Sequence, residues 1–149
     1  MKICIYGAGA IGAWLGVKLS LAGEDVTLIA RGPHLAAMQK NGVKLLMDGK
    51  EEVAHPRCFE DPADAGPQDY IIVTLKAHSL PGIANNLAPL LGPDTAVVTG
   101  VNGIPWWYFY KLDGPYENQT LESVDPGGRF WNAVGPERAI GLVVYPAAE

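Results

Sequence analysis

Short apolar runs alternate along the chain with longer segments in which apolar residues recur at helical spacing. Residues 2–6 are an apolar run that ends at Gly7, and residues 69–75 are almost continuously apolar. Such runs are typical of strands that are buried on both faces of a parallel sheet. Residues 10–22 instead carry apolar side chains at helical spacing and stop at Gly23, a common helix end. The pattern therefore indicates alternating strands and helices.

The same pattern predicts an order of elements for the whole chain. Predicted strands cover residues 2–6, 25–30, 43–47, 51–55, 69–75, 95–99 and 139–145. Predicted helices cover residues 10–22, 33–40, 79–90 and 129–134, and a short aromatic helix is predicted to start near Pro105. Segments 56–68 and 113–128 are interpreted as loops. Because strands alternate with helices, we predict a Rossmann-type α/β fold, a doubly wound and mainly parallel sheet with helices on both faces.

One pair of predicted strands departs from this alternation. Residues 43–47 and 51–55 are joined by Asp48-Gly49, a dipeptide that is typical of two-residue hairpin turns. We therefore expect a β-hairpin at this point of the chain.

A glycine-rich turn joins the first predicted strand to the first predicted helix. The residues Gly7-Ala8-Gly9-Ala10-Ile11-Gly12 satisfy the pattern G-x-G-x-x-G. The first glycine permits a tight turn, the second lets a pyrophosphate approach the backbone, and the third brings helix and strand close together. The helix N-terminus presents free N–H groups and a partial positive charge to the phosphates. We predict a dinucleotide-binding site, the alternative being a purely structural glycine turn.

The tip of the second predicted strand distinguishes between the two nicotinamide dinucleotides. NAD-binding units place an acidic residue about 20 residues after the glycines, where it bonds the ribose 2′-hydroxyl. Here the segment Leu28-Ile29-Ala30-Arg31-Gly32 contains no acid, and Arg31 stands where a 2′-phosphate would arrive. A guanidinium suits a phosphate in charge and in geometry. We therefore predict NADP as the cofactor, the alternative being a solvated arginine at a strand end.

Composition and charge argue against several other classes of function. The chain of 149 residues suits one domain, and its formal net charge of −5 argues against nucleic acid as partner, because phosphate neutralisation needs surplus Lys and Arg. No uninterrupted apolar stretch is long enough to span a membrane. Cys4 and Cys58 show no disulfide or metal-site pattern, and Cys4 is interpreted as a small buried hydrophobe. We expect a cytoplasmic protein.

Other candidate chemistry is sparse. His34, His55 and His78 lack the spacing of metal ligands, so no metal site is predicted, and no Ser-His-Asp or Cys-His arrangement can be argued. His78, which follows Lys76 by two residues, is interpreted as a helix-start or surface residue rather than as part of a cleft. The aromatic run at 106–110 is interpreted as packing in a helix or against another domain rather than as base stacking.

Three segments, taken together, are more specific than the glycine turn alone. They are MKICIYGAGAIGAWLGVKL at the start, VTLKA at 73–77 and VNGIPWW at 101–107, and the closing stretch GPERAIGLVVYPAAE is consistent with them. Together they resemble the N-terminal domain of the ketopantoate reductase family, the 2-dehydropantoate 2-reductases. The resemblance covers essentially the whole chain. It implies reduction of a 2-keto acid to a 2-hydroxy acid with NADPH, the type reaction being 2-dehydropantoate to pantoate in the pantothenate pathway.

The resemblance also implies roles for individual residues. Gly7 to Gly12 would bind the pyrophosphate, and Arg31 would bind the 2′-phosphate. Lys76 and Asn102 would lie at the C-terminal ends of the fourth and fifth strands and contact the cofactor near its substrate side. Lys76 also ends an apolar strand, where a charged side chain is otherwise out of place. A solubilising charge and a simple Asn-Gly turn are the alternatives for these two positions.

Two positions match the family less closely. Ala148 corresponds to a further cofactor contact. Val101, the residue before Asn102, stands where the family often has Gln or His. Because relatives of unknown substrate share the family pattern, the identity of the keto acid stays open.

No catalytic residue is predicted in this chain. Hydride transfer to a ketone needs a proton donor for the developing alkoxide and groups that hold the substrate carboxylate. In the resembled family, a Lys and a supporting Glu come from a helical C-terminal domain, and this sequence ends at Glu149, before such a domain. We interpret residues 1–149 as the NADP-binding domain of a truncated reductase, inactive alone. We also expect self-association through the surface that the missing domain would cover.

Two other functions stay open from the sequence. One is a non-catalytic NADP(H)-sensing domain that works by binding a partner. The other is the cofactor domain of a related hydroxyacid dehydrogenase with another substrate. Lys76 and Asn102 at the predicted strand ends favour the keto-acid reductases over this second function.

Overall fold

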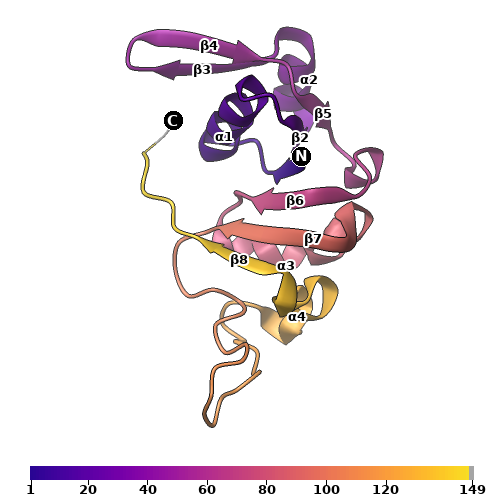
Figure 1. Cartoon of the computed structure of the whole chain (residues 1–149), viewed down its shortest axis with the longest axis vertical. Coiled ribbons are helices and arrows are strands. Elements are labelled where there is room, and N and C mark those ends of the chain that lie inside the picture. The colour runs from indigo at the N-terminus through magenta and orange to yellow at the C-terminus, as the bar shows by residue number, and fades with distance from the viewer. Residues whose placement is uncertain (148–149) are drawn as a thin grey trace.

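A six-stranded parallel sheet forms the centre of the computed structural model, which describes residues 1–147 (Figure 1). The strands are β1 (Lys2–Tyr6), β2 (Asp25–Ile29), β5 (Arg57–Phe59), β6 (Gln68–Val73), β7 (Leu91–Gly100) and β8 (Ala139–Leu142). Their order across the sheet is β5-β2-β1-β6-β7-β8, and every neighbouring pair is parallel. The direction of winding reverses between β1 and β6, as in a doubly wound Rossmann sheet. The predicted fold class is confirmed.

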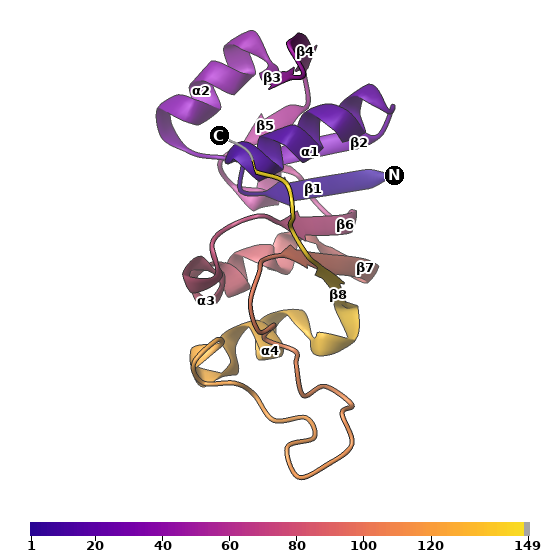
Figure 2. The same cartoon turned by 90° about the vertical axis from the view of Figure 1, so that its left-hand side faces the viewer.

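Helices and turns pack on both faces of this sheet (Figure 2). The helices are α1 (Ala10–Leu21), α2 (Gly32–Asn41), α3 (Leu80–Ile83) and α4 (Arg129–Val134). Successive strand residues point to opposite faces, so each strand contributes to two cores. Ile5 packs in one core with residues of α1 and α2, and its neighbour Cys4 packs in the other with residues of α3 and α4.

Both cysteines serve as apolar filling of these cores. Cys4 is fully buried and Cys58 is 6% exposed, and both are free thiols. Burial raises the pKa of the Cys4 thiol to about 12 and also raises the pKa of Cys58. Both side chains therefore stay protonated and unreactive at neutral pH, because only the thiolate is nucleophilic. The interpretation of Cys4 as a buried hydrophobe is confirmed.

The predicted hairpin is confirmed as well. Its strands, β3 (Val43–Met47) and β4 (Lys50–Ala54), pair antiparallel and form a separate two-stranded sheet. Asp48 and Gly49 between them have positive φ angles of 52° and 72°. Such angles are those that a two-residue turn of the primed type requires.

One strand lies where the sequence predicts a loop. β5 has only three residues and joins the sheet at its edge, beside β2. The N–H of Ala30 donates to the carbonyl oxygen of Phe59 across this junction, at 3.0 Å. The three residues of β5, which lie between Pro56 and the Asp61-Pro62 turn, are too few to show a strand periodicity. The pairing with β2, rather than the local sequence, makes this segment a strand.

Several predicted elements have different forms or limits: β6 ends at Val73 instead of residue 75, and β7 begins at Leu91 instead of residue 95. The segment 79–90 is a 3₁₀ turn (Ala77–Ser79), then α3, then a 3₁₀ segment (Ala84–Leu90) that contains Pro89, which lacks the N–H of a regular helix. Near Pro105 there is no helix, and residues 106–111 form successive turns. The last strand, β8, ends at Leu142 instead of residue 145.

Tertiary packing explains the turns of the aromatic run. Trp106 is 1% exposed, and its ring centroid lies 5.1 Å from that of Phe130 in α4. Tyr108, two residues later, is 50% exposed. Burying one large ring against α4 therefore anchors the loop after β7, while other rings of the run remain accessible. The predicted packing role holds for Trp106, but in a turn and not in a helix.

The close contact of α1 with β1 depends on two glycines. A Cβ atom at Gly12 would overlap the carbonyl oxygen of Gly7 and would lie 2.7 Å from Oγ1 of Thr74. Gly7 itself has a φ of 109°, which L side chains rarely adopt. Thr74, just after β6, donates its hydroxyl proton to the same Gly7 carbonyl. The turn, the helix and two central strands thus meet at one carbonyl group.

We expect Gly12→Ala to lower the free energy of unfolding by about 3 kcal/mol or more, because overpacking against backbone cannot be relieved by a rotamer change. Gly82→Ala is the matched control, since a Cβ atom at Gly82 would meet nothing within 4 Å. It should be neutral or slightly stabilising. Urea denaturation followed by tryptophan fluorescence measures both. Equal stabilities of the two variants would contradict the contact described here.

Candidate functional site

The first turn of α1 presents unpaired backbone donors at the carboxyl edge of the sheet. Gly9 precedes the helix in an extended conformation (φ −71°, ψ −169°), and no side chain caps the helix. Within residues 1–147, the N–H groups of Ala10, Ile11 and Gly12 have no backbone acceptor. Unpaired donors and the helix dipole together make this end of α1 attractive to anions such as phosphate.

Gly9 is a glycine that the packing of the protein itself does not require. Its φ is one that any residue adopts, and a Cβ atom built on it would meet no heavy atom within 4 Å. A Cβ atom at Gly7 or Gly12, in contrast, would meet Leu75 or Thr74. Open space in front of the Gly9 backbone suits a group that approaches closely from outside the chain.

A pocket of about 520 Å³ lies at the same edge of the sheet. It is lined by residues 7–9 and 29–31 and by the side chains of His34, Glu60, Leu75 and Ile83, among others. These residues follow or border the carboxyl ends of β1, β2, β5 and β6. In open α/β sheets, ligands bind outside these strand ends, where the strand order reverses. The pocket therefore brings the glycine turn and Arg31, two of the predicted site features, into one lining.

Two further residues of this pocket were missed by the sequence interpretation. Glu60 follows β5, and its place beside the end of β2 depends on a strand that the pattern does not reveal. His34 lies in the first turn of α2, and its Nε2 atom is 2.7 Å from the carbonyl oxygen of Ala8. Residues three apart at a helix start lie on the same face of the helix. The spacing of Arg31 and His34 could therefore have indicated that both side chains border one site.

Lys76 and Asn102 lie at the other half of the carboxyl edge. Lys76 comes three residues after β6 and precedes a 3₁₀ turn, and Asn102 comes two residues after β7. Both are exposed, as is His78. β6 and β7 are parallel neighbours, so the two residues leave the sheet on the same side. Their predicted places at the ends of the fourth and fifth strands of the Rossmann sheet agree with this topology.

The side chain of Asn102 is engaged with the backbone. Its Nδ2 donates to the carbonyl oxygen of Val144, and its Oδ1 accepts the N–H of the same residue, both at 3.0 Å. This pairing holds residues 143–147, the crossing segment, as it runs from β8 past the strand ends toward α1 (Figures 1 and 2). Pro146 and Ala147 there line a second pocket with Ala10 and other residues. Ala148, a predicted cofactor contact, lies outside the described residues.

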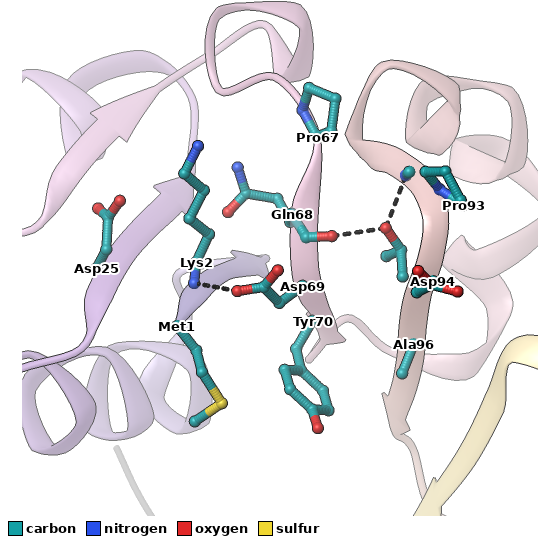
Figure 3. A pocket seen from close by; sticks show the side chains of 12 residues that line it. Met1, Lys2, Asp25, Pro67, Gln68, Asp69, Tyr70, Pro93, Asp94 and Ala96 are labelled. Carbon is teal, nitrogen blue, oxygen red and sulfur yellow. Dashed lines mark hydrogen bonds between the residues drawn. The ribbon is translucent and has the colours of Figure 1, made fainter.

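A larger hollow of about 620 Å³ lies at the opposite, amino edge of the sheet (Figure 3). Several of its polar groups bond within the protein, although the buried Oε1 of Gln68 has no hydrogen-bond partner among the described residues. Asp69 accepts the N–H of Lys2 at 2.8 Å. The hydroxyl of Thr95 donates to the carbonyl oxygen of Gln68 at 2.6 Å and accepts from the N–H of Gly92 at 2.7 Å. These bonds join β1, β6 and β7 where the strands begin. We interpret this hollow as structural, since open α/β sheets bind ligands at the carboxyl edge.

Two further properties concern membranes and metals. None of the helices within residues 1–147 has the length and apolar character that crossing a membrane requires. In the same part of the chain, no three His, Cys, Asp or Glu side chains are grouped so that they could hold a metal ion.

Comparison with known proteins identifies the family. The sequence model described as Ketopantoate reductase PanE/ApbA matches residues 3–105. The chain belongs to the ketopantoate reductase family. A 2-dehydropantoate 2-reductase from Mesorhizobium japonicum is 52% identical over 150 residues, which cover 100% of this chain and 46% of the relative. A 2-dehydropantoate 2-reductase from Pyrococcus horikoshii is 38% identical over 104 residues, 70% of this chain and 34% of the relative.

Solved structures agree with this membership. A protein from Ralstonia solanacearum MolK2 that is assigned to the ketopantoate reductases is 44% identical, with a TM-score of 0.89 over 97% of this chain and 44% of that chain. D-Mandelate dehydrogenase, solved with NADH and anilino(oxo)acetate, is 32% identical, with a TM-score of 0.64 over 70% of this chain and 35% of that chain. The chain thus spans less than half the length of these members of the ketopantoate reductase family and of this dehydrogenase.

If the turn holds the diphosphate of a nicotinamide dinucleotide, Gly9→Ala should weaken binding of NADPH by at least about tenfold, a loss of about 1.4 kcal/mol, because the added methyl group occupies the open space before the turn. The free energy of unfolding should fall by no more than about 1 kcal/mol, the scale of a helix-cap change. Isothermal titration and urea denaturation measure the two effects separately. Undiminished NADPH affinity in a folded Gly9→Ala protein would show that this space is not used by the cofactor.

Proposed function

We propose that this chain is the NADPH-binding domain of an oxidoreductase that reduces a 2-keto acid, 2-dehydropantoate, to the 2-hydroxy acid pantoate by hydride transfer. The observation that carries the proposal is Gly9, whose backbone faces open space at the start of α1, in a pocket shared with Arg31. Family membership and relatives named 2-dehydropantoate 2-reductase support the reaction class.

The residues present are suited to a dinucleotide phosphate. Among residues 1–147, the N–H groups of residues 10–12 have no backbone acceptor and are free to donate to a diphosphate. Arg31 offers a guanidinium to the 2′-phosphate, and the apolar side chains of Ile29 and Ile83 border the space for the adenine ring. In this proposal Lys76 and Asn102 contact the cofactor near its nicotinamide. Ala148 is retained as a proposed contact. When bound, the nicotinamide supplies the hydride.

The preference for NADP over NAD rests on Arg31. No acidic residue stands at the tip of β2, where an NAD-binding unit would bond the ribose 2′-hydroxyl. Glu60 borders the same pocket, but it comes from the end of β5. A solved relative, D-mandelate dehydrogenase, is described with NADH, so the likeness in fold does not by itself select NADP, and the preference is assigned to Arg31.

We expect Arg31→Ala to weaken NADPH binding roughly tenfold to a hundredfold while it leaves NADH binding nearly unchanged. The reason is that a charge-assisted hydrogen bond to the 2′-phosphate contributes about 1.5–3 kcal/mol. Arg57→Ala is the matched control, since Arg57 pairs with Asp25 at the amino ends of the strands. Tryptophan fluorescence quenching gives all the dissociation constants. An unchanged NADPH/NADH affinity ratio in Arg31→Ala would disprove the assignment to NADP.

We further propose that proton transfer to the substrate is carried out by the part of the family proteins that this chain does not span. Residues 1–149 would then form the cofactor domain, with the keto acid held between it and a second, helical domain. No catalytic residue is assigned within residues 1–149.

Under this proposal, residues 1–149 should reduce 2-dehydropantoate at least about a hundredfold more slowly than the full-length Mesorhizobium relative, because the proposed general acid belongs to the other part of the family proteins. NADPH oxidation at 340 nm measures both rates under identical conditions. Adding the C-terminal half of that relative in trans should restore part of the rate. Turnover by the isolated chain at a rate close to that of the relative would refute this division of roles.

A hydroxyacid dehydrogenase with another substrate is the second candidate function. The resemblance to D-mandelate dehydrogenase favours it, because that protein is 32% identical over 70% of this chain. Val101, beside Asn102, borders the half of the edge where a substrate would lie, so the keto acid itself is best identified by assaying a panel of 2-keto acids.

Two minor proposals complete the assignment. We propose a cytoplasmic location, which the two free, buried cysteines of residues 1–147 suit, since disulfides are rare in reducing compartments. We also propose that isolated chains self-associate through apolar side chains near the carboxyl edge. Ile104, Val143 and Tyr145 are 62%, 63% and 89% exposed there.

A further inference from the structure

His34 makes a hydrogen bond that the glycine motif does not predict. It lies in the first turn of α2, and its Nε2 atom is 2.7 Å from the carbonyl oxygen of Ala8. Ala8 is the second residue of the glycine turn and is only 6% exposed. The bond therefore joins the helix that begins after Arg31 to the loop in front of α1.

The chemistry of the two partners fixes the direction of this bond. A carbonyl oxygen can only accept a hydrogen bond, so Nε2 of His34 must carry the proton. The neutral ring with its proton on Nε2 and the imidazolium both meet this requirement. The bond is therefore compatible with either charge state of the ring.

Holding the Ala8 carbonyl also orients the N–H of Gly9. The peptide bond between them is trans, so its C=O and N–H point to opposite sides of a rigid plane. With the oxygen turned toward α2, the Gly9 N–H is turned away from α2, and it has no acceptor within residues 1–147. Glycines at positions 7 and 9 flank this short stretch and give it the greatest backbone freedom. The bond from His34 is the side-chain contact that holds the Ala8 carbonyl in one orientation.

We propose that His34 is a positioning residue for the cofactor diphosphate, which it serves by locking the Ala8–Gly9 peptide. The inference rests on the proposed function. It gives His34 a role distinct from that of Arg31. Arg31 recognises the 2′-phosphate, which only NADP carries, whereas the glycine turn meets the diphosphate, which both dinucleotides carry. Loss of the His34 bond must therefore weaken NADPH and NADH alike.

Three variants of the full chain test this role. His34→Leu removes the donor, and His34→Gln replaces it with an amide Nε2–H that has a similar reach. Gln39→Leu is the matched control from the same helix. Its Nε2 donates to the carbonyl oxygen of Cys58 at 2.9 Å, and Gln39 does not line the pocket. Dissociation constants for NADPH and NADH and a thermal melting midpoint are measured for each variant.

We expect His34→Leu to weaken both dinucleotides by roughly threefold to tenfold, the loss that one hydrogen bond represents, with an unchanged NADPH/NADH ratio. His34→Gln should restore most of the affinity. Gln39→Leu should lower the melting midpoint and leave both dissociation constants unchanged. A purely structural role for His34 would move the midpoint in the same way as Gln39→Leu and would not alter binding.

Three results overturn the inference. They are unchanged affinities in His34→Leu, a loss confined to NADPH, and a loss that His34→Gln does not restore. If the wild-type chain binds NADPH and Arg31→Ala weakens this binding but His34→Leu does not, this inference is refuted and the proposed function stays intact. A wild-type chain that binds neither dinucleotide refutes both.

Discussion

The contact between the start of α1 and the end of β1 is the constraint on which the rest of the structure depends. Gly12 lies against the carbonyl group of Gly7, and the hydroxyl of Thr74 from the β6 side bonds the same oxygen. Without a side chain between them, the helix reaches the carboxyl edge with first N–H groups that have no backbone acceptor among residues 1–147. The point where the sheet reverses its winding is thus also a point that attracts anions.

The two halves of the carboxyl edge are built differently. On the β2 side, α2 and β5 bring Arg31, His34 and Glu60 around one pocket. On the β7 side, the side-chain amide of Asn102 forms two hydrogen bonds with the backbone of Val144. These bonds hold the crossing segment over the strand ends. The half that we propose for the nucleotide is therefore a pocket lined by this chain, while the other half carries exposed apolar residues. This asymmetry supports the proposal that this chain binds the cofactor and that a second domain completes the substrate site at the other half of the edge.

The parts of the fold with long, regular patterns could be predicted from the sequence. The apolar run of β6, the helical spacing of α1 and the Asp48-Gly49 turn each specify their own conformation locally, and all three are correct. β5 could not be predicted, because three residues have no periodicity and only hydrogen bonds to β2 make them a strand. The helix expected near Pro105 was wrong because burial of Trp106 against Phe130 overrode local preference. In the same way, Glu60 was missed together with β5.

For this protein, the sequence by itself determined the fold class, the glycine turn and the position of Arg31, because each depends on neighbours along the chain. Only the tertiary structure decided which side chains share the pocket with Arg31, what Asn102 bonds, and that His34 reaches the Ala8 carbonyl. Those contacts join residues 26 to 42 positions apart, and no local pattern records the direction in which a side chain will meet a distant backbone group.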